Sequence, residues 1–139
     1  MKFVFKMLVA FVVLMGVGSA NLFAGDNKDP IFVNMISDDP HGTIMALHFS
    51  TKMLNKGHPI SILINNKGIN VILKSNKKYA EQQKMIEVLV NKGATVLYCP
   101  MCLEALKKKE ADVISGVKES SPDLMEQALF KDNTKTMTW

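Results

Sequence analysis

The chain has 139 residues, with 17 lysines and no arginine against 13 acidic residues, and its formal net charge is +4. That length suits one compact domain, and a composition of 47% hydrophobic and 22% charged residues excludes a disordered tail. Two cysteines are too few for a disulfide scaffold or a four-thiolate zinc fold. Arginine is the residue best suited to phosphate and guanine contacts, so its absence leads us to expect no nucleic-acid partner.

The first 24 residues have the features of a secretory signal peptide. Lys2 and Lys6 give a positively charged start, and an apolar run broken only by one glycine follows over residues 7–17. That run is shorter than the roughly 20 residues that span a bilayer. An uncleaved N-terminal anchor is the alternative interpretation.

Small residues near the end of this leader mark two candidate cleavage sites, after Ala20 and after Ala24. We predict a signal peptide over residues 1–24 and one mature domain over residues 25–139. The mature protein is then expected in a bacterial periplasm or outside the cell, with no stable membrane insertion after cleavage. Thiols in those compartments face an oxidising environment.

Apolar strands and helical patterns alternate along the mature chain. Strands are predicted over residues 31–36, 59–64, 94–98 and 134–139, with loop and a little strand over 112–117. Helices are predicted over residues 43–55, 78–91, 99–108 and 121–130. The order βαβαβαβαβ, with continuous apolar strands, is typical of an α/β fold in which helices cover both faces of a parallel sheet.

A Cys-Pro-Met-Cys motif follows the third predicted strand, at the sheet edge where α/β proteins bind ligands. If Pro100 is the first helical residue, Cys99 is the N-cap and Cys102 lies in the first turn. The free N–H groups of a helix N-terminus favour a thiolate and can lower a cysteine pKa to about 3.5–7.5. We predict Cys99 as nucleophile and Cys102 as the resolving or second thiol; a structural pair or an inert disulfide is the alternative.

Polar residues follow the first two predicted strands at the same edge. His41, in the turn after the first strand, is a candidate base or ligand, and a turn histidine bonded to nearby backbone is the alternative. Asp38 and Asp39 are explained equally well as turn formers and as a cap for the following helix. Residues 65–67, Asn-Asn-Lys, follow the second strand and should lie beside the cysteines.

These motifs together resemble the DsrE/DsrF-like family, in particular exported members with a Cys-Pro-x-Cys loop. The resembling stretches are residues 37–41, 56–59, 66–69, 93–102 and 115–118, and the strand ending at Trp139. The resemblance implies a three-layer α/β sandwich in which helices cover both faces of a mostly parallel five-stranded sheet. It also implies a homo-oligomer, a trimer or a hexamer.

The family also implies a function. Its best-understood members are sulfurtransferase subunits that carry a persulfide on the cysteine after the third strand, which corresponds to Cys99. We therefore predict an exported persulfide or sulfane-sulfur carrier in which Cys99 accepts sulfur and Cys102 releases it by forming a disulfide. Its partners would be sulfur donor and acceptor proteins or small sulfur compounds, and no cofactor is expected.

Two other functions use the same thiols. A periplasmic thiol–disulfide oxidoreductase is one, because the motif is similar to the Cys-Pro-x-Cys loop of thioredoxin-like oxidants, although it lies too late in the chain for that fold. A binding module for a soft metal such as Cu(I) is the other, with Cys99, Cys102 and either Met101 or His41 as ligands. Two thiolates alone make an incomplete zinc site, so a partner subunit would have to contribute. The carrier hypothesis requires no metal.

Overall fold

The computed structural model describes residues 28–139, so the predicted signal peptide lies outside the described residues. Within them, five strands form one sheet in the order β4-β3-β2-β1-β5, and every pair is parallel. The strands are β1 (Ile31–Met35), β2 (Ile60–Ile64), β3 (Thr95–Tyr98), β4 (Lys118–Glu119) and β5 (Lys135–Thr138). The predicted five-stranded α/β sandwich is confirmed, and its sheet is parallel throughout.

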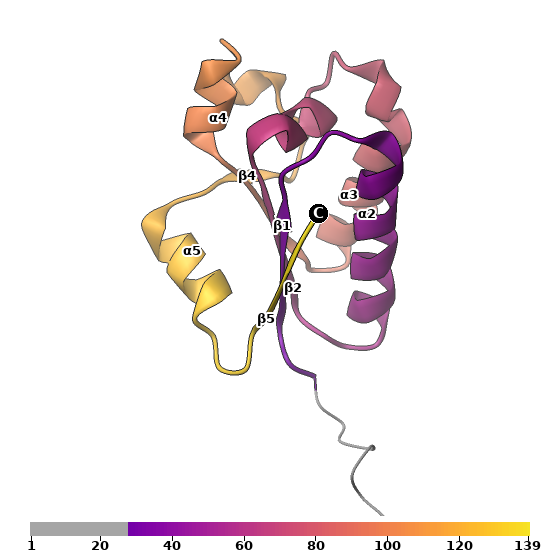
Figure 1. Ribbon diagram of the computed structural model, residues 1–139, viewed down its shortest axis with the longest axis vertical. Coiled ribbons are helices and arrows are strands. Elements are labelled where there is room, and N and C mark those ends of the chain that lie inside the picture. Colours follow the sequence, from indigo (N-terminus) through magenta and orange to yellow (C-terminus); the bar gives the residue numbers. More distant parts are fainter. Residues whose placement is uncertain (1–27) are drawn as a thin grey trace, which may run out of the picture.

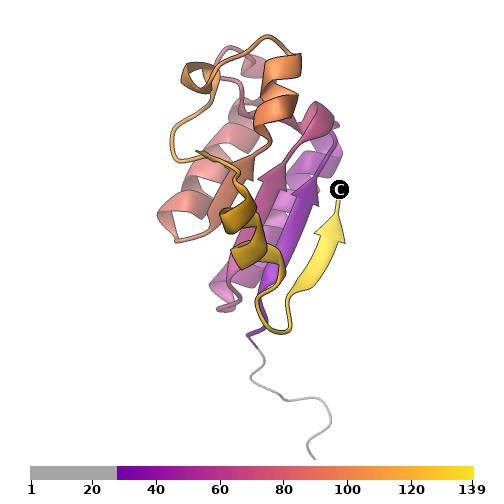
Figure 2. The ribbon, with the colours of Figure 1, turned by 90° about the vertical axis from the view of Figure 1, so that its left-hand side faces the viewer.

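Helices lie on both faces of this sheet. The α-helices of the described part are α2 (Pro40–Asn55), α3 (Ala80–Asn91), α4 (Pro100–Ala105) and α5 (Pro122–Leu129). Short 3₁₀ helices are η1 (Asn66–Ile72), η2 (Lys77–Tyr79) and η3 (Glu110–Asp112). Figure 1 shows α2 and α3 together on one side of the sheet and α4 and α5 on the other. Figure 2 shows α5 across the sheet and α4 near the end to which the strand arrows point.

The central strands are buried because helices cover both of their faces. Val33 and Met35 in β1 and Ile62 and Ile64 in β2 have no exposed surface. Burying one side chain of this size stabilises a fold by roughly 1.5–3 kcal/mol. The edge strands differ, since every residue of β4 and β5 is exposed. Among residues 28–139, no helix has the length and apolar character needed to cross a membrane.

Three helices begin in the same way, with a capping side chain followed by proline. Proline suits the first helical position because its missing N–H would have no helical partner there. The capping contacts are Gly42 N to Asp39 Oδ2 at 2.6 Å, Cys102 N to Cys99 Sγ at 3.3 Å, and Leu124 N to Ser121 Oγ at 3.3 Å. The predicted caps at residues 99 and 121 are confirmed. Helix α2 starts at Pro40, earlier than predicted, because Asp39 caps it.

The segment after α4 differs from its prediction. A little strand was expected over residues 112–117, whereas β4 is Lys118–Glu119. A strand of two exposed polar residues has no apolar pattern that a sequence could show. Val113 and Val117 are buried instead, and Val113 forms an isolated antiparallel bridge with Leu73.

Candidate functional site

The cysteine motif lies where the carboxyl ends of β2 and β3 meet. Cys99 follows β3 directly, and its N–H donates to the carbonyl oxygen of Ile64, the last residue of β2, at 3.0 Å. This contact places the start of α4 beside the loop that leaves β2. The predicted position of both thiols at the carboxyl edge of the sheet is therefore correct.

The two thiols touch each other. Cys102 Sγ donates to Cys99 Sγ across 2.8 Å, and both cysteines are half-buried and unbonded. A disulfide requires a sulfur–sulfur distance of about 2.05 Å, so oxidation of the pair by an external oxidant would need only a small movement of the two sulfurs. The geometry therefore permits disulfide exchange, attack by one thiolate on sulfur held by the other, and capture of a soft metal between two thiolates.

The surroundings of Cys99 oppose the lowered pKa that its cap position predicts. Burial raises the pKa of the Cys99 thiol, and the neighbouring Cys102 raises it further, because two thiolates at this distance repel each other. The backbone N–H groups of Cys102 and Met101 lower the pKa, but burial and the neighbouring thiol outweigh them. The expected lowering of the Cys99 pKa was therefore wrong, because the helix N-terminus is only one of the groups that surround this sulfur.

This raised pKa predicts how Cys99 responds to pH. The thiolate forms only as the pH rises through the raised value, so alkylation of Cys99 by iodoacetamide should have its midpoint above the ordinary value of about 8.5. Peptide mass spectrometry measures the modification at this residue separately from Cys102. The same chain unfolded in urea is the control, and a folded midpoint at or below the unfolded one would contradict the prediction.

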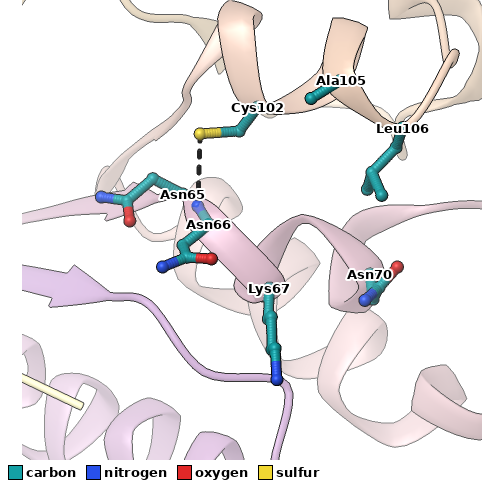
Figure 3. A pocket seen from close by; sticks show the side chains of 7 residues that line it. All are labelled: Asn65, Asn66, Lys67, Asn70, Cys102, Ala105 and Leu106. Atoms are coloured by element: carbon teal, nitrogen blue, oxygen red, sulfur yellow. Dashed lines mark hydrogen bonds between the residues drawn. The ribbon is translucent and has the colours of Figure 1, made fainter.

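Cys102 faces the loop after β2. The backbone N–H of Asn66 donates to Cys102 Sγ at 3.3 Å, the contact drawn as a dashed line in Figure 3. Cys102 also borders a cavity of about 380 Å³, whereas Cys99 does not line it. The other lining residues are Asn65, Asn66, Lys67, Asn70, Ala105 and Leu106.

The loop that carries Asn66 is held by its own contacts. Asn66 adopts a positive φ of 48°, which asparagine tolerates better than most residues. The Asn65 side-chain amide donates to Asn34 Oδ1 at 2.7 Å, and Gly68 packs against the backbone of Met35. Sequence reasoning placed residues 65–67 at this edge but missed the N–H donated to the thiol. The turn composition Asn-Asn-Lys-Gly at residues 65–68 was the one feature of the sequence that indicated an unusual backbone at this loop.

The loop after β1 is partly structural. Asp38 accepts a hydrogen bond from Asn70 Nδ2 at 3.0 Å, and its carbonyl oxygen accepts one from Tyr79 Oη at 2.7 Å. With Asp39 as the cap of α2, both aspartates hold the fold, as the turn interpretation predicted. His41 is exposed near the start of α2 and is not among the described residues that line the cavity. Its role as a base or ligand stays a prediction.

A complete metal site is not built into this part of the chain. Residues 28–139 contain no group of three or more His, Cys, Asp or Glu side chains that could hold a metal ion. Met101, considered as a soft ligand between the thiols, is 77% exposed. The two thiolates are the soft ligands that Cu(I) prefers, whereas a structural zinc site would need further ligands from elsewhere.

The comparison with family models decides where the protein belongs. A model of the DsrE/DsrF-like family matches residues 30–134, which include every strand except the last and all of the thiol loop. The chain belongs to the DsrE/DsrF-like family. Membership indicates a role related to sulfur relay, in which proteins of this family work with partner proteins.

Solved structures share the fold of this DsrE/DsrF-like protein. One is the protein of unknown function MTH1491 from Methanobacterium thermoautotrophicum, with a TM-score of 0.63, 15% identity, and coverage of 81% of this chain and 100% of that chain. Another is the ychN protein from E. coli, with a TM-score of 0.66, 15% identity, and coverage of 81% and 99%. No curated protein sequence matches the chain. At this identity the two structures support the fold alone.

Proposed function

We propose that this DsrE/DsrF-like protein is a persulfide carrier that accepts sulfane sulfur on Cys99 and uses Cys102 to discharge it. The 2.8 Å contact between the two sulfur atoms is the observation that carries the proposal. A single carrier cysteine would need no second thiol at this distance. Membership of a family with roles related to sulfur relay supports the same function.

The proposed reaction has two steps. The Cys99 thiolate attacks the outer sulfur of a donor persulfide, which leaves a persulfide on Cys99 and releases the donor thiolate. The persulfide then either passes its outer sulfur to an acceptor thiolate or is attacked at Cys99 Sγ by the Cys102 thiolate. The second route expels hydrosulfide and leaves a disulfide, so two electrons move from the thiols to the sulfane sulfur. His41, on the same sheet edge, is the proposed proton acceptor.

The proposal includes a location and an assembly. The leader over residues 1–24 supports export to the periplasm. Strand β5 at the sheet edge is exposed at every position, and the exposed apolar side chains of Met137, Ile36 and Met45 support a homo-oligomer. The proposed size, a trimer or a hexamer, comes from the resemblance to the family alone. Light scattering of the purified mature protein measures the number of subunits.

Intact mass spectrometry tests the carrier function. Protein from the periplasm that has been reduced and then freed of reductant should gain sulfur atoms on exposure to polysulfide, and the Cys99→Ser variant should gain none. The Cys102→Ser variant is the matched control, because it keeps the acceptor thiol and should load. The same spectra give the leader cleavage site. A disulfide-bonded wild type that takes up no sulfur, even after reduction, would contradict the proposal.

A thiol–disulfide oxidoreductase is the second candidate, because the same sulfur–sulfur contact lets the pair close into a disulfide. This function predicts that the oxidised protein exchanges with a dithiol substrate and that the reduced protein shows no sulfur uptake. The mass measurement therefore separates the two functions.

A further inference from the structure

We infer that the cavity beside Cys102 binds a small anionic thiol, which reopens the disulfide between Cys99 and Cys102 by attacking Cys102. The inference rests on the proposed function, because discharge through Cys102 leaves the pair oxidised. A carrier in that state accepts no further sulfur until an external thiol restores both cysteines.

Access to the two sulfurs differs. Cys102 borders the cavity and Cys99 does not, so a thiol bound there meets the sulfur of Cys102. Figure 3 shows the Cys102 side chain extending from α4 toward the Asn66 loop, at one end of the group of lining side chains. The N–H of Asn66 contacts the same sulfur at 3.3 Å and holds it at the cavity wall.

The cavity wall suits a compact molecule with polar ends. Its volume of about 380 Å³ lies within the roughly 300–1,000 Å³ typical of small-molecule sites. Asn65, Asn66 and Asn70 bring amide groups, whereas Ala105 and Leu106 form an apolar side. A short organic thiol matches this division, since its carbon chain packs on the apolar side and its polar group reaches the Asn66 amide; the Asn65 and Asn70 amides already donate to Asn34 and Asp38.

The charge of the wall selects an anion. Lys67 is the one charged side chain among the seven described residues that line the cavity, and its ammonium extends away from Cys102, so it attracts an anion at the outer part of the wall (Figure 3). The lysines at 107–109, which follow Leu106, are balanced by Glu104, Glu110 and Asp112, so Lys67 is the cation that acts on a bound molecule. The Asp38 carboxylate, which could oppose an anion, accepts a hydrogen bond from Asn70 and does not line the cavity. Lys67 would therefore attract a carboxylate group on the bound thiol.

The reaction is ordinary thiol–disulfide exchange. The external thiolate attacks Cys102 Sγ, the bond between the two cysteines breaks, and the electron pair leaves on Cys99. The backbone N–H groups of Met101 and Cys102 stabilise the Cys99 thiolate by hydrogen bonding. A second external thiolate then attacks the mixed disulfide, which frees Cys102 and yields the small disulfide. The external thiol is thus the reductant, and two molecules are consumed in each cycle.

Reduction rates with three small thiols test the charge selection. The oxidised protein is treated with 3-mercaptopropionate (anionic), 2-mercaptoethanol (neutral) and cysteamine (cationic), and each rate is divided by the thiolate concentration. We expect the anion to be fastest and its advantage to shrink as salt rises. Lys67→Gln should reduce the anion-to-cation ratio roughly threefold to tenfold, the scale of one nearby charge. Lys131→Gln, at a separate cavity beside Pro30 and Pro59, is the matched control and should leave the ratio unchanged.

The position of the adduct tests the point of attack. Acid quenching early in the reaction traps the mixed disulfide, and fragmentation of the peptide locates it. An adduct on Cys102 is expected, whereas an adduct on Cys99, or a ratio that Lys67→Gln does not change, would overturn the inference. Sulfur uptake is measured separately, so a protein that loads sulfur but shows no anion preference refutes only this inference. A protein that shows the preference but never loads refutes the carrier proposal.

Discussion

A Cys102→Ser variant loaded with sulfane sulfur should keep its persulfide far longer than the wild-type protein. The wild-type Cys102 sulfur lies 2.8 Å from the sulfur that carries the load, so attack is intramolecular and has a high effective concentration. Serine is a much weaker nucleophile, and its hydroxyl cannot form a disulfide. In the absence of any acceptor thiol, we expect hydrosulfide release to slow by roughly a hundredfold or more.

A sulfide-selective probe measures this release, and intact mass follows the loss of the adduct over the same time. Met101→Ala is a suitable control, because Met101 lies between the two cysteines, is 77% exposed, and carries no thiol. It should discharge like the wild type. Equal release from Cys102→Ser and wild type would show that Cys102 is not the resolving thiol, while leaving sulfur uptake on Cys99 in place.

Gly68→Ala should destabilise the fold more than any other alanine substitution of a described glycine. A Cβ atom at Gly68 would lie 2.6 Å from the carbonyl oxygen of Met35, a backbone atom of the central strand β1. The Gly68 N–H also donates to the carbonyl oxygens of Ile36 and Asn65. Backbone that cannot move away makes this overpacking cost about 3 kcal/mol of unfolding free energy.

Urea unfolding followed by circular dichroism measures that loss. Gly93→Ala is the comparison, because Gly93 has a φ of 95° but open space around its missing side chain. Strain alone at such a position costs about 1 kcal/mol. A Gly68→Ala variant as stable as Gly93→Ala would mean that the loop after β2 adapts easily and does not hold Asn66 in place.

The three buried strands could be predicted from the sequence because each is a continuous apolar run bounded by turn residues. The edge strands show why the rest is harder. β5 was found through its alternating threonines, although all of its residues are exposed. β4 was placed too early, since Val113 and Val117 look like strand residues but pack against other elements, and the strand itself is Lys118–Glu119.

The site was predicted in outline but not in its electrostatics. The cap position of Cys99 follows from the proline after it, which is a local signal. The raised pKa of Cys99 comes from burial and from the second thiol, and burial depends on the whole fold. The same holds for the Asn66 N–H, which meets Cys102 only because β2 and β3 are neighbours.

Cys99 also caps its helix, as Asp39 and Ser121 cap the two other helices that begin with proline. Its sulfur accepts the N–H of Cys102 and so closes the first turn of α4, a helix of six residues. A thiolate accepts a hydrogen bond more strongly than a sulfur tied up in a disulfide or a persulfide. Each change in the chemical state of Cys99 therefore weakens or strengthens the cap of the short helix that carries Cys102 and Ala105. Because both residues line the cavity, the sulfur bound to Cys99 and the shape of the cavity wall are linked.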